Sequence, residues 1–381
     1  MSNILLESLE IENFRSFRHL KINQLGRVNL IVGKNNVGKT SLLEALSIYA
    51  HRGSPSWIWD ILEARDETSR VFRGSIQNDD EDRIQIEDFK CLFYGRKILK
   101  EQENVIKIGS GKSDNTLSIG IGWYIIESEG KVSRKLPPVS STELSSVEKF
   151  VPGLALQFGK VIDTFYRLNN THYFDRQTRI PELEPTGIKC FYIPSNGLNH
   201  ILIEECWDNI ALTSYQQHVI DSLRIIEPGV DGLNFIKDKK RRPAGPYEPQ
   251  RIPVIRMAGF EDRLALGSLG EGMNRILGIS LALSNAAEGV LLINEIESGL
   301  HYSVQADMWR VVLQMAWKLN VQVFATTHSW DCIEGFQKAI QKENRKEGYL
   351  IRLGRKKEDI VATVYDETEL AVITRDQIEV R

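Results

Sequence analysis

The stretch that decides the fold of this chain is "VNLIVGKNNVGKTSLLEAL", residues 28–46. It begins with a short, largely apolar run that is typical of a buried strand. The run "GKNNVGKT", residues 33–40, then fits the pattern G-x-x-x-x-G-K-[ST] in full. Leu42, Leu43 and Leu46 follow at helical spacing. This order of strand, glycine loop and helix predicts a phosphate-binding loop, called the phosphate loop below.

The residue types in the phosphate loop suit the binding of a nucleotide. Its glycines let backbone N–H groups wrap around phosphates, and the start of the following helix adds a favourable dipole. The lysine reaches the β and γ oxygens, and the threonine hydroxyl meets Mg²⁺. The residues expected to bind the nucleotide are Gly33, Lys34, Asn35, Asn36, Gly38, Lys39, Thr40 and Ser41.

A second glycine-containing motif, "LGSLGEGMNRIL", spans residues 266–277. Ser268, Gly270 and Gly272 lie directly before a strongly apolar helical segment. A hydroxyl and several backbone donors therefore gather at a helix N-terminus, which predicts a second anion site. An ordinary helix cap is the alternative explanation for the serine.

Two polar segments follow apolar strands in the last third of the chain. In "GVLLINEIESGLH", residues 289–301, Asn294 and Glu295 come after four apolar residues. In "VFATTHS", residues 323–329, His328 stands at the tip of the next expected strand. The ordered set of motifs is far more specific than any one of them.

With these motifs in this order, the chain resembles ATP-binding-cassette ATPases of the SMC, RecF and OLD-like branch. It is especially similar to the small bacterial AAA-type ATP-binding proteins often found in phage-defence operons. The resemblance runs from "IENFRSF" at residues 11–17 to "ATTHS" at residues 325–329 and on to the final strands. It implies an α/β P-loop NTPase fold: an ABC-type head with an antiparallel β sub-domain and a helical lobe.

The resemblance also implies an ATP-sandwiched, head-to-head homodimer in which Ser268, Gly270 and Gly272 of one subunit close on the nucleotide held by the other. Residues 298–301 would cross that interface.

The resemblance further assigns catalytic roles to several residues, and Lys39 is one of them. It implies that Glu295 polarises the attacking water, and a carboxylate at a strand end beside a phosphate loop suits that task. It implies that His328 senses the γ-phosphate, with a buried structural histidine as the alternative. Arg15 in "NFRSF" matches a position near the nucleotide in relatives, with a surface arginine as the alternative.

Asn294 departs from the pattern, because relatives usually carry an aspartate there that holds the magnesium shell. The expected metal ligands are Thr40 and Asn294, together with the phosphates. Asparagine keeps one carbonyl acceptor but loses a charge, so it binds hard cations less well. Loss of the carboxylate also removes like-charge repulsion at Glu295. The sequence leaves open which effect dominates, and whether the asparagine is natural to this branch or introduced.

Composition agrees with a protein of this class. Apolar residues make up 42% of the chain, charged residues 26%, and the net charge is −3, so any polyanion binding must come from a local patch. The four cysteines show no C-x-x-C spacing, which argues against a zinc site or a disulfide framework. The start of the chain lacks a signal-peptide pattern and no run of 18 apolar residues occurs, so we expect a cytoplasmic protein without a membrane anchor.

The pattern of expected elements suggests three parts. Residues 1–195 would form the first half of the ATPase head, with the phosphate loop and an antiparallel insertion that includes a hairpin at 104–128. Residues 196–260 would form a helical lobe, and 261–381 the second half of the head. In this last part helices alternate with apolar strands, which predicts a parallel sheet.

Several other features carry weaker predictions. The basic run at Lys237 and residues 239–242 could contact phosphate backbones of DNA, but its short length and flanking prolines favour a solvated loop. Trp57 and Trp59 are expected to be core or interface aromatics. Gln85 and Gln157 lack the context needed to assign a lid-loop glutamine. The roughly fifty residues after His328 leave no room for the nuclease domain of OLD-type relatives.

Three functions are consistent with these residues. The first is a dimeric Mg²⁺-dependent ATPase that regulates a partner effector, in bacterial anti-phage defence. The second is an ATP-locked clamp or scaffold whose turnover is weak because of Asn294. The third is a DNA-repair or chromosome ATPase that contacts DNA, although no long heptad segment indicates a coiled-coil arm.

Overall fold

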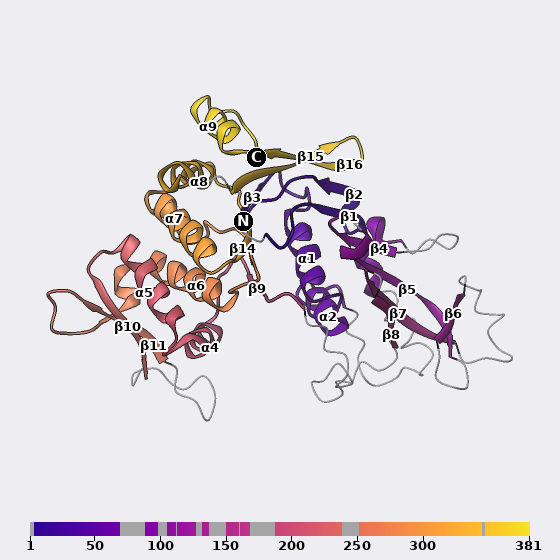
Figure 1. Cartoon of the computed structure of the whole chain (residues 1–381), viewed down its shortest axis with the longest axis horizontal. Helices are drawn as coiled ribbons and strands as arrows, with labels where there is room; N and C mark the ends of the chain where they lie inside the picture. The colour runs from indigo at the N-terminus through magenta and orange to yellow at the C-terminus, as the bar shows by residue number, and fades with distance from the viewer. Residues whose placement is uncertain are drawn as a thin grey trace.

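The computed structural model describes residues 4–68, 88–97, 105–111, 113–126, 132–136, 150–159, 161–167, 187–237, 251–344 and 347–381. A central sheet separates a helix-rich side of the molecule from a side that holds helix α1 (Lys39–Ala50) and a large antiparallel sheet (Figure 1). Within these residues, none of the helices combines the length and apolar character needed to cross a bilayer.

The central sheet has six strands in the order β16-β15-β3-β14-β13-β9. Neighbouring strands are parallel, except that β16 pairs antiparallel with β15. The carboxyl ends of β3, β14 and β13 therefore meet at one edge of the sheet. The strands are β3 (Val28–Val32), β9 (Cys190–Ile193), β13 (Val290–Ile293), β14 (Gln322–Thr326), β15 (Gly348–Lys356) and β16 (Asp359–Tyr365).

Alternate residues of the central strands face two different hydrophobic cores. Leu291 and Ile293 of β13 join the core on the helix-rich side, whereas Leu292 joins the core around α1. A sheet covered on both faces must be apolar on both faces, which explains the continuous apolar runs in the sequence. The helices of the helix-rich side include α6 (Glu271–Asn285), α7 (Tyr302–Lys318) and α8 (Trp330–Glu343), and α9 (Glu367–Arg375) packs against α8.

Helix α1 lies between the central sheet and the antiparallel sheet (Figure 1). Its residues are buried except Thr40, because the helix packs against both sheets. The antiparallel sheet has the order β2-β1-β4-β5-β7-β8, with β6 paired to β5. Its strands are β1 (Leu9–Phe14), β2 (Phe17–Ile22), β4 (Val105–Gly109), β5 (Thr116–Ile126), β6 (Val132–Leu136), β7 (Phe150–Phe158) and β8 (Val161–Arg167).

Short helical segments border this sheet. They are α2 (Pro55–Glu63) and the 3-10 turns η1 (Lys90–Leu92), η2 (Tyr94–Arg96) and η3 (Ser113–Asn115). The tryptophans of α2 are structural, as expected. Trp57 donates a 2.7 Å hydrogen bond to the Ser47 hydroxyl and stacks on His51, and Trp59 packs against Phe89.

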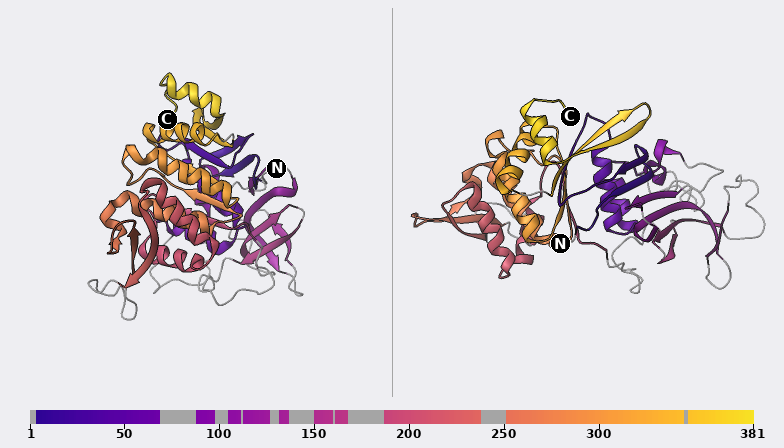
Figure 2. Two further views of the ribbon diagram at one scale, coloured as in Figure 1. Left: turned by 60° about the vertical axis from the view of Figure 1, so that its left-hand side comes forward. Right: turned by 45° about the horizontal axis from the view of Figure 1, so that its top comes forward.

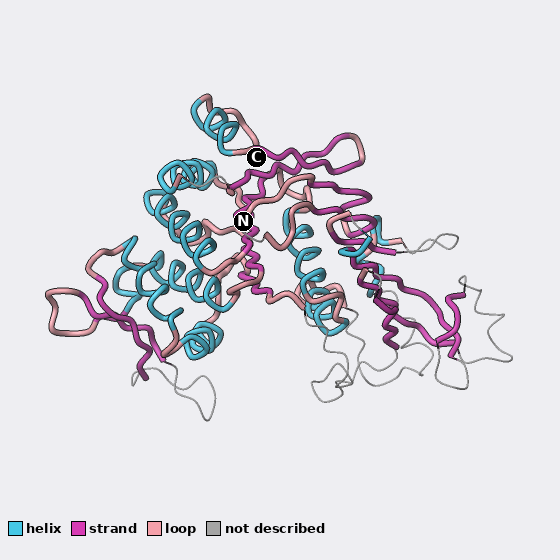
Figure 3. The backbone as a smooth tube through the Cα atoms, viewed as in Figure 1, coloured by secondary structure: helices cyan, strands magenta, loops and turns pink. Residues whose placement is uncertain are grey.

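The lobe expected to be helical is mixed in structure. Helices α4 (His200–Ile210) and α5 (Ser214–Ile226) are present, but β10 (Val230–Lys237) and β11 (Arg251–Met257) follow them as an antiparallel pair that the sequence pattern did not predict (Figure 3). A short strand, β12 (Leu264–Ala265), and the 3-10 turn η5 (Leu266–Leu269) then lead into α6. Most of the basic run, residues 239–242, and Gln85 lie outside the described residues.

The C-terminal hairpin of β15 and β16 reaches over the antiparallel sheet (Figure 2). At its tip Asp359 pairs with Arg18 of β2 at 2.5 Å. This hairpin places the carboxyl end of β15 beside the phosphate loop, because β15 runs parallel to β3. The predicted fold class, an α/β P-loop head with an antiparallel sub-domain, is confirmed.

Candidate nucleotide-binding site

The phosphate loop has backbone conformations that only glycine adopts easily. Gly33 and Gly38 have φ values of 142° and 92°. A Cβ atom at Gly33 would lie 2.4 Å from the carbonyl oxygen of Leu353, and one at Gly38 would lie 2.5 Å from the Ser16 hydroxyl. Close packing against the C-terminal hairpin and the β1–β2 turn therefore shapes this loop.

Lys39 is the buried cation of the loop, with 6% of its surface exposed. Its ammonium group donates to the carbonyl oxygens of Gly33 at 2.5 Å and Lys34 at 3.0 Å. Burial lowers the pKa of Lys39 to about 8, opposed by the carboxylates of Glu295 and Glu297. The ammonium group is thus held inside the loop, where it interacts electrostatically with two carboxylates.

The start of α1 adds further donors to the site. No acidic residue lies in its first turn, so the helix itself carries no carboxylate that offsets the positive end of its dipole. Thr40 is half-buried and Ser41 is buried in this turn, whereas Lys34, Asn35 and Asn36 form the exposed rim of the loop. This arrangement is a typical binding site for phosphate groups.

A hydroxyl of the middle strand organises the acidic segment that follows β13. The hydroxyl of Thr326, at the end of β14, accepts a 2.9 Å hydrogen bond from the backbone N–H of Glu295. The same hydroxyl donates to the side-chain oxygen of Asn294 at 2.9 Å. Glu295 adopts a left-handed backbone conformation, with φ of 49°. Two strand ends are therefore tied together at the residue expected to act as the base.

Glu297 is a second carboxylate in the site. One of its oxygens accepts a 2.9 Å hydrogen bond from the backbone N–H of His328. The other oxygen, Oε2, is buried and has no hydrogen-bond partner among the described residues. A buried carboxylate oxygen without a partner costs free energy unless a ligand or water satisfies it. Glu297 therefore belongs to the site rather than to the solvated surface.

Arg275 reaches the same segment from α6. Its guanidinium donates to the backbone oxygen of Glu295 at 3.1 Å, and burial lowers the pKa of Arg275, opposed by the carboxylates of Glu297 and Glu295. It links the helix that follows the second glycine motif to the acidic segment.

The roles of Thr326, Glu297 and Arg275 were not predicted from the sequence. Each forms its hydrogen bond with a residue at least 20 positions away in the sequence; Glu297 and His328, for example, are 31 positions apart. The only local signal was a pair of acidic residues spaced two apart in "NEIES", residues 294–298.

His328 has an exposed side chain, so the alternative of a buried structural histidine is wrong. Among the described residues, its hydrogen bonds involve the backbone: Glu297 accepts from the N–H, and Arg381 donates to the carbonyl oxygen at 3.5 Å. The imidazole is therefore free to meet a ligand at the sheet edge.

Ser268 and Gly270 lie at the surface, where the second glycine motif turns into α6. The hydroxyl of Ser268 donates to the carbonyl oxygen of Ala265 at 2.6 Å, and no side chain caps the N-terminus of α6. The helix-cap explanation for Ser268 is therefore wrong. Gly270 has φ of 100°, and a Cβ atom at Gly272 would make an ordinary 3.5 Å contact with Leu300. The backbone N–H of Met273 donates to the carbonyl oxygen of Gly270 at 3.2 Å, so among the described residues the N–H groups of Glu271 and Gly272 are left for another acceptor.

Arg15 has a structural role. Its side chain is only 5% exposed, and it forms ion pairs with Glu44 of α1 at 2.6 Å and with Glu67 at 2.8 Å. Arg65 pairs with the other oxygen of Glu44 at 2.5 Å. The surface-arginine alternative is wrong, and two carboxylates hold the guanidinium that was expected near the nucleotide. We therefore leave Arg15 out of the site.

Comparisons with known proteins agree with this geometry. A family model described as AAA ATPase domain matches residues 5–177 and 234–333, which is more than half of the chain. An ATP/GTP phosphatase from Helicobacter pylori is 23% identical over 363 residues, covering 89% of this chain and 90% of that protein. The DNA replication and repair protein RecF from Rickettsia massiliae is 41% identical over 49 residues, which is 13% of this chain and 14% of RecF.

Two solved structures with similar folds are SMC heads. One, an SMC head bound to the C-winged helix domain of ScpA, has a TM-score of 0.47 and 13% identity, with 95% of this chain and 98% of that chain covered. The other, an SMC head domain from Thermotoga maritima, has a TM-score of 0.44 and 12% identity, with 94% and 98% covered. On the family match, the chain belongs to the AAA ATPase domain family and is an ATP-binding P-loop ATPase.

Proposed function

We propose that this ATPase hydrolyses ATP with Mg²⁺ as a head-to-head homodimer whose nucleotide-dependent closure regulates a partner effector protein in anti-phage defence. The observation that carries the proposal is the convergence of three groups at one sheet edge. Lys39 follows β3, Glu295 follows β13 and His328 follows β14, which lies between the other two strands. Strand order thus brings together a phosphate-binding cation, a carboxylate and an imidazole.

Each of these groups has a definite task in phosphoryl transfer. The phosphate loop and Lys39 hold the phosphates and offset the negative charge on the transferred group. Glu295 orients the attacking water and accepts its proton, and Thr326 keeps its backbone in place. The exposed imidazole of His328 contacts the γ-phosphate, while Glu297 anchors its backbone.

The oxygen donors around the loop fit Mg²⁺. The hydroxyl of Thr40 and the amide oxygen of Asn294 would hold it. The buried Oε2 of Glu297, which has no partner among the described residues, supplies the nearby negative charge that Asn294 lacks. When bound, Mg²⁺ offsets the charge of the phosphates. The hydrogen bond from Thr326 occupies one acceptor position of the Asn294 oxygen and leaves the second lone pair free.

The exposed second glycine motif supports the dimer. Ser268 and the uncapped N-terminus of α6 present a hydroxyl and backbone donors at the surface, which suits a phosphate held by a second copy. In this arrangement neither subunit has a complete site alone. The effector and the defence role rest on the resemblance to small ATPases of defence operons.

One observation favours a second candidate, an ATP-locked clamp with little turnover. Asn294 replaces the acidic residue of relatives, and weaker magnesium binding would slow hydrolysis more than nucleotide binding. The two candidates share the nucleotide site and the dimer and differ in turnover.

Steady-state phosphate release with ATP and Mg²⁺ separates them. The chain as given, Asn294→Asp and Glu295→Gln are compared. If the given chain releases phosphate and only Glu295→Gln abolishes the release, the result supports the enzyme. If the given chain releases no phosphate and Asn294→Asp does, the result supports the clamp. Activity retained in Glu295→Gln would remove Glu295 from the proposed mechanism.

Light scattering with ATP tests the dimer. The measurement uses the Glu295→Gln variant, in which ATP hydrolysis cannot dissociate the dimer. Ser268→Arg adds bulk and charge at the proposed interface and should leave a monomer. Arg256→Ala, which removes an exposed cation of β11 outside the motif, is the matched control. A nucleotide-dependent dimer that survives Ser268→Arg would contradict the model.

A further inference from the structure

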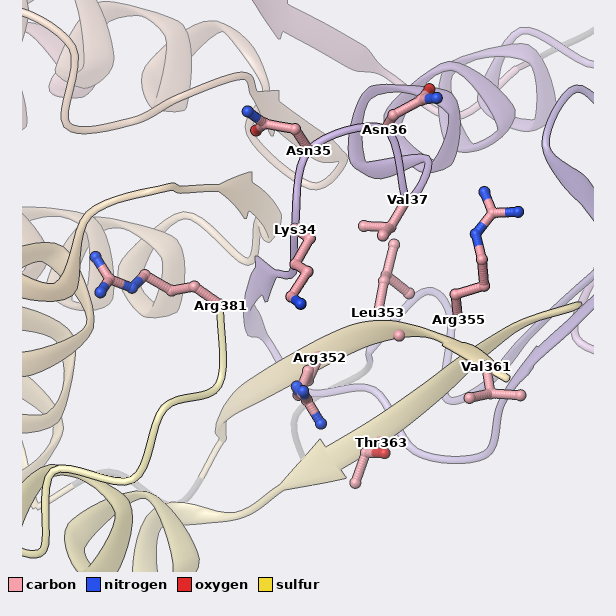
Figure 4. Close-up of a pocket in the computed structure, with 11 residues that line it drawn as sticks. Lys34, Asn35, Asn36, Val37, Arg352, Leu353, Arg355, Val361, Thr363 and Arg381 are labelled. Carbon is pink, nitrogen blue, oxygen red and sulfur yellow. The ribbon is translucent and has the colours of Figure 1, made fainter. Parts of the chain in front are cut away.

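A cavity of about 530 Å³ lies between the outer side of the phosphate loop and the C-terminal hairpin (Figure 4). Residues 34–37 of the loop form one wall, and residues 352–355 of β15 with Val361 and Thr363 of β16 form the other. Lys39 and Thr40 do not line the cavity, and the acidic segment after β13 does not line it either. The cavity therefore adjoins the nucleotide site and shares Lys34, Asn35 and Asn36 with it, but it does not contain the groups assigned to ATP hydrolysis.

The charge of this cavity is its main chemical feature. Four cations line it, namely Lys34, Arg352, Arg355 and Arg381, and its lining contains no carboxylate side chain among the residues that the structure describes. The whole chain has a net charge of −3, so this concentration of positive charge is local. Like charges gathered in a concave site attract an anion that offsets their mutual repulsion.

Two of these cations lack an internal counter-ion. Lys34 and Arg355 form no ion pair within the part of the chain that the structure describes. Arg352 donates through its Nε to the carbonyl oxygen of Val380 at 3.1 Å, and its terminal N–H groups have no other acceptor among the described residues, which leaves them for a ligand. Arg381 is already paired with Glu379 at 2.9 Å and contributes less.

The remaining lining residues suggest what kind of anion fits. Asn35, Asn36 and Thr363 offer neutral hydrogen-bonding groups, and Val37, Leu353 and Val361 add an apolar surface. The volume lies in the range of small-ligand sites and is larger than an inorganic phosphate needs. Arginine side chains bind phosphate in two-pronged geometry and also stack on flat rings.

We propose that this cavity is a second ligand site that binds the terminal phosphate of a nucleotide, either a free nucleoside monophosphate or the 5′-phosphate end of a strand. The cations hold the phosphate, and the amides with the apolar wall hold the nucleoside. Because residues 34–37 belong to the phosphate loop, the ligand contacts the loop that binds ATP. The proposal does not depend on the effector or on the dimer.

Calorimetric titration of the full chain carrying Lys39→Ala tests it, because this change removes competition from the phosphate loop. The probes are AMP, a single-stranded tetranucleotide with a 5′-phosphate, the same strand with a 5′-hydroxyl, and inorganic phosphate. We expect AMP or the 5′-phosphorylated strand to bind about tenfold or more tightly than the last two. Binding of AMP alone identifies a free nucleotide as the source, and binding of the phosphorylated strand alone identifies a strand end.

Variants locate the binding. Arg352→Ala and Arg355→Ala should each weaken it about tenfold, since each removes a charge-assisted hydrogen bond. Lys356→Ala removes a neighbouring cation of β15 that does not line the cavity, and screening should limit its effect to about twofold. With Lys39 intact, Arg355→Ala should leave ATP affinity unchanged.

Four results would overturn the proposal. They are the absence of binding by any probe, equal binding of inorganic phosphate or of the 5′-hydroxyl strand, equal losses in Lys356→Ala and the two arginine variants, and loss of ATP affinity in Arg355→Ala. The last result would assign the cavity to the ATP site itself.

Discussion

The hydroxyl of Thr326 donates a 2.9 Å hydrogen bond to the side-chain oxygen of Asn294. The same hydroxyl accepts from the backbone N–H of Glu295, so one atom of β14 positions two consecutive residues after β13. An aspartate at position 294 could accept the same hydrogen bond, so the asparagine keeps the local geometry while it lowers the charge. The departure at Asn294 thus changes the electrostatics of the site more than its shape.

Thr326→Val should lower kcat about tenfold or more with little change in KM for ATP. The change keeps the side-chain volume but leaves Glu295 and Asn294 without their shared partner, so the base is no longer held in position. Steady-state phosphate release measures the effect, and Thr326→Ser, which retains the hydroxyl, should recover most of it. Full kcat in the valine variant would show that this hydroxyl does not position the base.

Asn294→Asp should lower the Mg²⁺ concentration required for half-maximal turnover about tenfold, because a carboxylate binds a hard cation better than an amide does. The measurement is phosphate release against Mg²⁺ concentration at saturating ATP. Glu295→Gln in the same background should remain inactive, which separates metal binding from the base. An unchanged magnesium dependence would mean that position 294 does not contact the metal shell.

ATP affinity should fall as the pH rises through about 8, the pKa to which burial lowers Lys39. Bound phosphates favour the charged ammonium, so at pH values above 8 binding must take up a proton that the free protein has lost. Titration calorimetry at pH 8 in buffers of different ionisation enthalpy should report uptake of about half a proton. Phosphate itself titrates near pH 6, below this window. No uptake at pH 8 would contradict the assignment of Lys39.

Lys39→Ala should abolish ATP binding at micromolar concentrations, both for an ATPase that turns over and for an ATP-locked clamp. The change removes the only buried cation that the described part of the phosphate loop presents. Equilibrium binding of ATP with Mg²⁺ provides the measurement, and circular dichroism checks that the variant is folded. Retained micromolar affinity would refute the site.

Arg15→Ala should lower the free energy of unfolding by about 3 kcal/mol, because Glu44 and Glu67 lose their buried cation and keep only the more exposed Arg65 and Arg96. Burial already raises the pKa of Glu44, opposed by Arg15 and Arg65. Urea unfolding gives the measurement. The control is Arg18→Ala, which removes an ion pair whose arginine side chain is 61% exposed and should leave the midpoint nearly unchanged. Equal effects of the two changes would contradict the structural role of Arg15.

Much of the fold could be predicted from local patterns. The phosphate loop with its flanking strand and helix, the hairpin of β4 and β5, and the helix–strand alternation around β13 and β14 appear where the sequence patterns predict them. These elements have strong signals because their period, glycine positions and apolar runs lie within short windows. The strands β10 and β11 were missed, since residues 230–237 follow two helical segments and lack a clear hairpin turn before the proline-rich loop.

The candidate site divides in the same way. Lys39, Glu295 and His328 were selected from motif order, and the structure places all three after neighbouring strands of one sheet. Arg15 was given a nucleotide contact by resemblance, whereas the structure surrounds it with Glu44 and Glu67. The residues next to Arg15 in the sequence do not predict these partners, because they come from α1 and from the segment after α2.

The sequence by itself determined that this chain has a phosphate loop, an α/β head and an ATPase motif set with an asparagine in an unusual place. Only the tertiary structure decided how Thr326 and Glu297 support the acidic segment after β13, and which cations line the cavity beside the phosphate loop. The physical reason is distance along the chain. Periodicity and motif spacing report contacts within a few turns or strands, whereas hydrogen bonds across 31 or 32 residues depend on the order in which parallel strands pack.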